Sequence, residues 1–232
     1  MKKLTFFLLF FCISFLASAQ KYYSVEDTKW RIAVNGGYSR RIAILDKDSM
    51  DPVIYTHVKK LLGGFSGSAE AVYFTSKSGG FGFRINDFKT SNDELVTVTY
   101  NDGTSASGVM ADNIDIMFIG PVGMYRHLST WGERAFILNY GYGLIAYRNL
   151  STLIDDKYDI TGFTTGFMLE LGYDFTLTDH LAAGVSLSAI SGVLQQLSYT
   201  DSGGNKTTKK LDKDSYEGLM HVNLQIGLRL NL

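Results

Sequence analysis

Histidines are the first residues to consider for chemistry, because a histidine can serve as a general base or bind a metal. The chain has four: His57, His127, His180 and His221. It contains no HExxH motif, no paired-histidine spacing and no glycine-lysine phosphate loop, so neither a metal site nor a nucleotide site is indicated. A lipid hydrolase would need a histidine, a serine and an acid together at the outer rim. A combination of His57 or His221 with Ser66 or Ser215 is geometrically conceivable, but a serine-rich chain offers such trios by chance. We therefore predict no catalytic site, no metal and no cofactor.

A second set of residues combines charge with strand-like spacing. Each member stands among alternating apolar and polar residues, on what would be the inner face of a barrel: Arg31, Glu70, Arg84, Asp115, Glu170, Asp174 and Arg229. A buried charge must be paired, so the role of this set would be structural. We predict that Glu70, Arg84 and Asp115 form a network across three consecutive strands. The two other arginines would pair with the two other acids across the lumen.

The elements that must position these residues are strands. The C-terminal segment shows this best, since apolar residues occupy every second position from Met220 to Leu232. Period two is the signature of a strand. The composition agrees, because 24 glycines and 13% aromatics with only 2 prolines favour sheets. Eight segments follow the pattern: 30–39, 65–75, 80–88, 113–122, 135–147, 162–175, 180–192 and 220–232.

The connections between these segments alternate in length. The long ones cover residues 40–64, 89–112, 148–161 and 193–218, whereas 76–79 and 176–179 are short turns and 123–134 is intermediate. Short turns at one end and long loops at the other are typical of outer-membrane barrels. The predicted fold over residues 29–232 is therefore all-β: an eight-stranded antiparallel up-and-down transmembrane β-barrel with long extracellular loops and short periplasmic turns.

Contact with lipid fixes which side chains should point outward. Aromatic residues such as Trp30, Tyr38 and Phe163 belong on the outer face near the two membrane interfaces. The inner face should be polar or small, so we place Asp115 and Met117 inside and expect no charged residue on the lipid face of a strand core. An eight-stranded barrel is just wide enough for its own side chains, which predicts a filled lumen that does not conduct.

Three loops have features of their own. Asp51 as N-cap and Pro52 at the first helical position predict a short helix over 52–62, with its apolar side packed on the barrel rim. The sequence Asn101-Asp102-Gly103 predicts a hairpin that extends two strands above the membrane. The seventh connection mixes lysines with aspartates, which we interpret as a solvated loop.

The N-terminal segment indicates export. Lys2 and Lys3 precede an uncharged apolar run, and Ala17-Ser18-Ala19 has the small-x-small form of a cleavage site. We predict a cleaved signal peptide over 1–19 and a short periplasmic segment over 20–28. The apolar run of about 13 residues is too short for a spanning helix, which needs roughly 20.

The charge balance narrows the function classes. The chain has 22 basic and 23 acidic residues, and loss of the signal peptide leaves 20 against 23, a net charge of −3. Nothing in this balance attracts nucleic acid. The one cysteine, Cys12, lies in the signal peptide, so the mature chain would have no disulfide and no thiol nucleophile.

The sequence also resembles a known group of proteins. The resemblance is carried by the signal peptide, Phe118-Ile119-Gly120-Pro121 with Arg126 after it, Gly172-Tyr173-Asp174-Phe175, and the C-terminal strand that ends at Leu232. These motifs look like the small outer-membrane β-barrel proteins of Bacteroidota and, more distantly, like the transmembrane domain of the OmpA family. Members usually end in an aromatic residue, whereas this chain ends in leucine. The chain stops at the barrel, so tethering to the cell wall is not implied.

Three function classes remain. The first is a structural or surface-interaction barrel in the outer membrane, the second a narrow pore or transport accessory, and the third a lipid-modifying enzyme. We expect the first, and we predict that the protein is not an enzyme. The expected partners are outer-membrane lipid and lipopolysaccharide, the barrel-assembly machinery during biogenesis and an unidentified extracellular partner. We expect a monomer.

The predicted cleavage site can be tested directly. Protein extracted from the outer membrane should have the intact mass of a chain that begins at Gln20, because the Ala-Ser-Ala sequence precedes that residue. Retention of residues 1–19, or recovery of the protein in the soluble periplasmic fraction, would contradict this prediction.

Overall fold

The computed structural model describes residues 28–43, 50–99, 104–129, 133–213 and 216–232. The predicted signal peptide and the tip of the predicted hairpin at 101–103 lie outside these residues. Among the described residues, no helix is long and apolar enough to cross a membrane.

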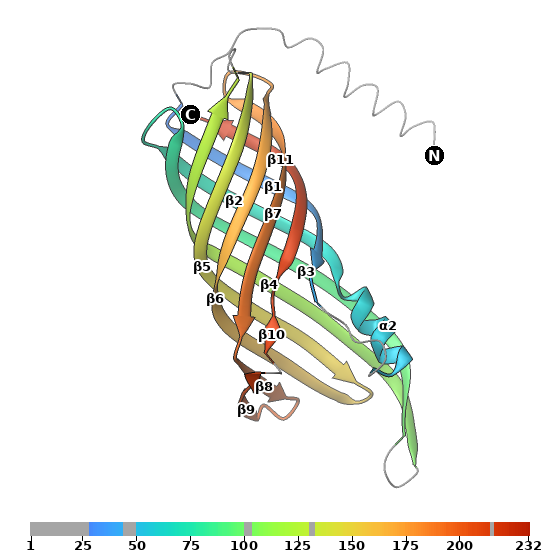
Figure 1. Ribbon diagram of the computed structural model, residues 1–232. Helices are drawn as coiled ribbons and strands as arrows, with labels where there is room; N and C mark the ends of the chain where they lie inside the picture. Colours follow the sequence, from blue (N-terminus) through green and yellow to red (C-terminus); the bar gives the residue numbers. More distant parts are fainter. Residues whose placement is uncertain (1–27, 44–49, 100–103, 130–132, 214–215) are drawn as a thin grey trace, which may run out of the picture.

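Eight antiparallel strands close into a ring (Figure 1). In chain order they are β1 (Trp30–Arg41), β2 (Gly63–Phe74), β3 (Gly79–Thr99), β4 (Ser105–Leu128), β5 (Arg134–Leu153), β6 (Asp156–Thr176), β7 (Leu181–Leu194) and β11 (His221–Asn231). Each strand pairs with its neighbours in sequence, β11 pairs with both β1 and β7, and β7 pairs with β6. The predicted fold class is confirmed, and the eight strands correspond one to one with the predicted segments.

The strands near the middle of the chain are much longer than predicted. β3 and β4 stay paired as far as Thr99 and Ser105, which confirms the extension above the membrane. β5 and β6 do the same as far as Leu153 and Asp156, where we expected a loop over 148–161. The outer end of the molecule is therefore built largely from continued strands (Figure 1).

Small elements complete the outer end. The helix α2 (Pro52–Lys60) begins as predicted, because the Asp51 carboxylate accepts a hydrogen bond from the Val53 N–H at 2.8 Å. Its His57 is buried, as are Leu61 and Leu62 just after it, while Val53 and Ile54 stay exposed. The last long connection contains β8 (Gln196–Asp201), β9 (Lys206–Lys210) and β10 (Glu217–Gly218), of which β8 and β9 form a hairpin that we had interpreted as a loop.

The lumen is filled by side chains of two kinds. One group is polar and lies mainly on β1, β2, β3, β6 and β11, with Asn139 of β5 and Ser186 and Ser188 of β7. The other is apolar and includes Phe74, Phe88, Phe118, Ile145 and Ile190, each no more than 1% exposed. These large side chains meet across the barrel, so the interior is a packed core.

The register of strand β4 differs from the predicted one. Ile114, Ile116 and Phe118 point into the lumen, whereas Asp115 and Met117 point outward. The error came from the assumption that every charge on a strand must face inward. Both faces of this segment are largely apolar, so the alternation alone did not choose between them, and packing against the apolar side of the lumen decided the register.

The outer surface is apolar up to a row of charges. Asp87, Lys89 and Asp115 point outward from neighbouring strands, with the Lys89 ammonium 3.1 Å from each carboxylate. From Gly79 to Lys89 the strand climbs about 25 Å, at roughly 3.3 Å per residue and a tilt near 40°. That height matches the apolar band of an outer-membrane barrel, which is about 25 Å tall. The charges therefore mark the upper edge of the lipid-facing wall, where we had expected no outward charge.

The register of β4 can be tested with two substitutions of adjacent residues. Asp115→Leu should change the unfolding free energy by less than about 1 kcal/mol, because Asp115 is partly exposed at the membrane edge. Ile116→Asp should cost several kcal/mol or prevent folding, because it places an unpaired carboxylate in an apolar core. Urea unfolding in detergent micelles gives both values. A larger loss from Asp115→Leu than from Ile116→Asp would favour the register predicted from the sequence.

Candidate functional site

The centre of the lumen contains an arginine held between two carboxylates. Arg84 of β3 donates from Nη1 to Glu70 Oε2 at 2.9 Å and to Glu170 Oε1 at 2.8 Å. Its Nη2 lies 2.7 Å from Glu170 Oε2. Glu70 comes from the adjacent strand β2, but Glu170 comes from β6 on the opposite wall. The guanidinium therefore bridges the barrel.

A second centre lies around Asp174 of β6. Arg31 donates from Nη2 to Asp174 Oδ2 at 2.8 Å, and Arg229 donates from Nε to Asp174 Oδ1 at 2.7 Å. Arg31 also donates to Glu70, which joins this centre to the first. Three arginines and three acids thus form one continuous network across five strands.

Neutral side chains complete the network. Asn139 donates from Nδ2 to Glu70 Oε2 at 2.8 Å, and Arg84 Nη2 donates to Ser68 Oγ at 3.1 Å. The Ser68 hydroxyl in turn donates to Gln225 Oε1 at 3.0 Å. All of these groups are buried. Multiple hydrogen bonds to each ion are what make a buried ion pair tolerable.

The structure brings six of the seven predicted network residues together and leaves Asp115 out. Asp115 pairs with Lys89 on the outer wall, so the prediction that it meets Glu70 and Arg84 is wrong. Its absence makes the remaining set electrically balanced, with three positive and three negative charges. The fourth acid that we expected inside would have left the network with one more negative than positive charge.

A buried arginine that we did not assign closes the periplasmic end. The Arg126 guanidinium lies 3.8 Å from the centroid of the Phe74 ring and donates from Nε to the Lys77 carbonyl at 2.8 Å. Its Nη1 donates to Thr28 Oγ1 at 3.0 Å. The period-two pattern of Phe118, Gly120, Val122 and Met124 would have placed Arg126 inside, had strand β4 been read in the correct register.

Space for the Asp174 centre depends on a glycine. A Cβ on Gly184 would lie 2.2 Å from Asp174 Oδ1 and 2.9 Å from Arg229 Nε. Contacts this short do not occur between real atoms, so any larger residue at 184 would displace the ion pair. The inner face was predicted to be polar or small, and at this position the glycine leaves room for Arg229.

At the outer rim, His57 takes part in a polar cluster that joins α2 to the barrel. Its Nε2 lies 2.8 Å from Asp112 Oδ2, and its Nδ1 lies 2.8 Å from Asn92 Nδ2. Asn149 donates to the other Asp112 oxygen at 2.7 Å. Since an amide N–H donates to Nδ1, the contacts fit a ring that carries its proton on Nε2 and donates it to Asp112. This cluster fastens the helix to β3, β4 and β5.

The trio required for a lipid hydrolase is not assembled by the described residues. Both ring nitrogens of His57 are occupied by Asp112 and Asn92, and neither contacts a serine. His221 is buried, and its Nδ1 lies 2.9 Å from the Leu219 carbonyl oxygen. Ser66 accepts a hydrogen bond from Gln225 at 2.8 Å instead. Ser215 lies outside the described residues.

Comparisons with known proteins support the fold. No protein-family model matches the sequence, and no curated protein matches it. A major outer membrane protein from Thermus thermophilus matches with a TM-score of 0.54 and 12% identity, over 89% of this chain and 100% of that chain. Outer membrane protein OprG from Pseudomonas aeruginosa gives a TM-score of 0.47 and 14% identity, over 90% and 99%. The outer membrane protease OmpT from Escherichia coli gives 0.47 and 8%, over 93% and 100%.

The likeness to the Thermus thermophilus protein, the closed ring of strands and the apolar outer wall define the class. The protein is a small outer-membrane β-barrel.

The network predicts that removal of Arg84 lowers the stability of the barrel much more than removal of Lys209. Arg84→Ala should cost about 3 to 5 kcal/mol, because it leaves Glu170 buried without its ion-pair partner. Adding Glu170→Gln should recover part of that loss by removing the stranded charge. Lys209→Ala, on the exposed outer hairpin, should change stability by less than about 0.5 kcal/mol. Midpoints of the heat-induced gel shift measure all three variants, and equal midpoints for Arg84→Ala and Lys209→Ala would contradict the assignment.

Proposed function

We propose that this protein is a structural or surface-interaction barrel that acts through its extracellular parts and is not an enzyme. The observation that supports this proposal is the lumen, which is filled by side chains and crossed by an ion-pair network of three arginines and three acids. Ions need a continuous water path, and packed apolar layers on either side of the ion-pair network leave little room for one. The interior therefore serves stability rather than transport.

The outer end of the molecule carries the segments that lie beyond the lipid-facing wall. Four long strands continue beyond the lipid-facing wall, and α2 and the β8–β9 hairpin are added there (Figure 1). Strand β3 exposes 80% of Leu95 on this extension. A rigid scaffold that holds exposed segments at one end is the usual arrangement for recognition.

Several expectations from the sequence form part of the same proposal. They are the cleaved signal peptide over 1–19, the periplasmic segment over 20–28, insertion by the barrel-assembly machinery, contact with lipopolysaccharide and a monomeric state. The kinship with Bacteroidota barrels and the OmpA transmembrane domain rests on the quoted motifs. An extracellular partner completes the proposal.

Conductance measurements distinguish the proposed interaction barrel from a narrow pore. Purified protein in planar lipid bilayers should show no reproducible single-channel steps, because the network occupies the lumen. Glu70→Gln and Arg84→Gln should leave the recordings silent as long as the barrel stays folded, and Lys209→Gln is the control for a charge change outside the lumen. Steady openings whose size changes in the two lumen variants would overturn the proposal in favour of a narrow pore.

A further inference from the structure

The barrel wall is interrupted near the outer end, between β6 and β7. The ladder that joins these strands ends at Gly166 and Gly192. Pairing of β6 resumes only at Thr161, which faces Ser198 of β8. Within the described segment 133–213, residues 162–165 of β6 therefore have a strand partner on the β5 side alone. A hydrogen bond from Thr164 Oγ1 to the Val193 carbonyl, 2.8 Å long, crosses the gap.

The gap is sealed from the lumen by two leucines. Leu194 is fully buried, and Leu197 is nearly so. Both pack against Gly162, where an added Cβ would lie 2.9 Å from one and 3.0 Å from the other. The interruption therefore does not lead into the lumen.

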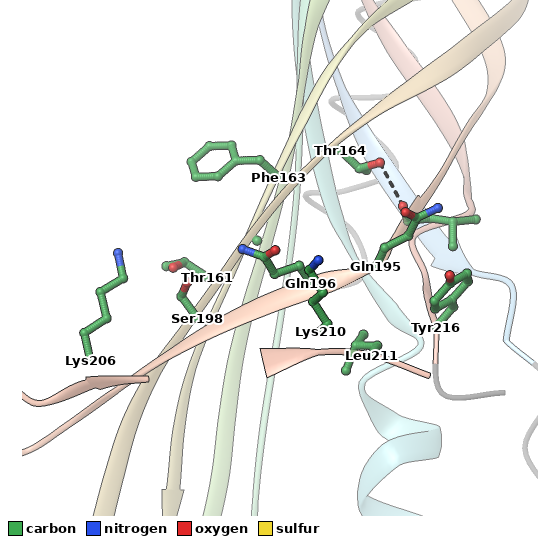
Figure 2. A pocket seen from close by; sticks show the side chains of 12 residues that line it. Thr161, Phe163, Thr164, Gln195, Gln196, Ser198, Lys206, Lys210, Leu211 and Tyr216 are labelled. Carbon is green, nitrogen blue, oxygen red and sulfur yellow. Dashed lines mark hydrogen bonds between the residues drawn. The ribbon is translucent and has the colours of Figure 1, made fainter. Parts of the chain in front are cut away.

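The interruption forms part of a cavity beside the β8–β9 hairpin (Figure 2). The cavity has a volume of about 550 Å³. That size lies within the range of pockets that hold small ligands, about 300 to 1,000 Å³. Its walls come from β6, the end of β7, the hairpin and the segment that follows it.

One side of the cavity is cationic. Lys206 and Lys210 line it, because alternate residues of β9 share a face, whereas Lys209 belongs to the opposite face with its ladder partner Leu197. Of the described residues that line the cavity, none is an aspartate or a glutamate. Across the part of the chain that the structure describes, neither cavity lysine has an ion-pair partner. Lys206 and Lys210 are four residues apart on an extended strand, a separation of about 13 Å. Together with the amides of Gln195 and Gln196 they line the cavity with groups that can donate hydrogen bonds to an anion with several oxygen atoms.

The other side is apolar and continues the outer wall. Phe163 is 77% exposed and points outward from β6, and Val193 of β7 is also exposed. Leu211 and Tyr216 line the cavity as well (Figure 2). A ligand here would place its charged group against the lysines and an apolar part along the wall, which is the chemistry of an anionic amphiphile.

We propose that this cavity binds the phosphate-bearing headgroup of a lipid in the outer leaflet. Phosphate supplies the charge and the oxygen acceptors that the two lysines and two amides require. The acyl part of the lipid would lie beside Phe163 and Val193. The inference rests on the proposed function, because it gives the extracellular end a binding partner. The lipid measurement is nevertheless independent of conductance, so either proposal can fail alone.

The test uses the full-length mature protein in detergent micelles, titrated with diphosphorylated lipid A and followed by native mass spectrometry. The double variant Lys206→Gln/Lys210→Gln should weaken binding roughly tenfold or more, a loss that corresponds to the removal of charge-assisted hydrogen bonds. Lys209→Gln removes one positive charge, against two in the double variant, from the opposite face of the same strand, and it should bind as the wild type does. Equal affinities of the double variant and Lys209→Gln would overturn the site.

Two further arms separate the lipid from its phosphate. Dephosphorylated lipid A should bind as weakly to the wild type as the phosphorylated lipid binds to the double variant. Glucose 1-phosphate, which carries the phosphate without acyl chains, should bind more weakly than lipid A. Phe163→Ser should reduce this difference in affinity, because it removes an apolar contact for the acyl part. Equal binding of glucose 1-phosphate and lipid A would overturn the assignment to a lipid. The heat-induced gel shift verifies that every variant contains a folded barrel.

Discussion

In the hydrocarbon layer no water can pair with a backbone N–H or C=O group, so a sheet that crosses it must close on itself. The pairings of β11 with β1 and of β6 with β7 achieve this closure, and the remaining features depend on it. Closure fixes the alternation of faces, because each side chain points either to lipid or to a narrow lumen. It also brings strands that are far apart in the sequence close enough for their side chains to meet.

The narrow lumen imposes the second condition, the pairing of the charges that meet at its centre. Arg84 bridges Glu70 and Glu170, and Asp174 holds Arg31 and Arg229, so the positive and negative charges of this network are equal in number. The glycine at 184 provides the space for this arrangement. An interior arranged in this way contributes to stability, and interaction with other molecules is left to the parts of the molecule outside the membrane.

Beyond the charged row at Lys89 and Asp115, the requirement for a closed sheet no longer applies. The strands can separate there because water satisfies their backbone groups. β6 leaves β7 and pairs with β8, and the cavity between the wall and the hairpin results from this change of partner. The location of the cavity therefore follows from where the membrane ends.

The sequence by itself determined the number of strands, their antiparallel order, the side on which the long loops lie and the start of α2, because alternation, turn residues and capping are local signals. It also placed six network residues inside. The register of β4 was decided by the tertiary structure, since the face that carries Asp115 also carries Met117 and Ile119, and packing in the apolar core favours Ile116 over Asp115. The β8–β9 hairpin and its cavity were likewise decided there. Their strands are short and polar, and their pairing depends on contact with β6, which no local pattern specifies.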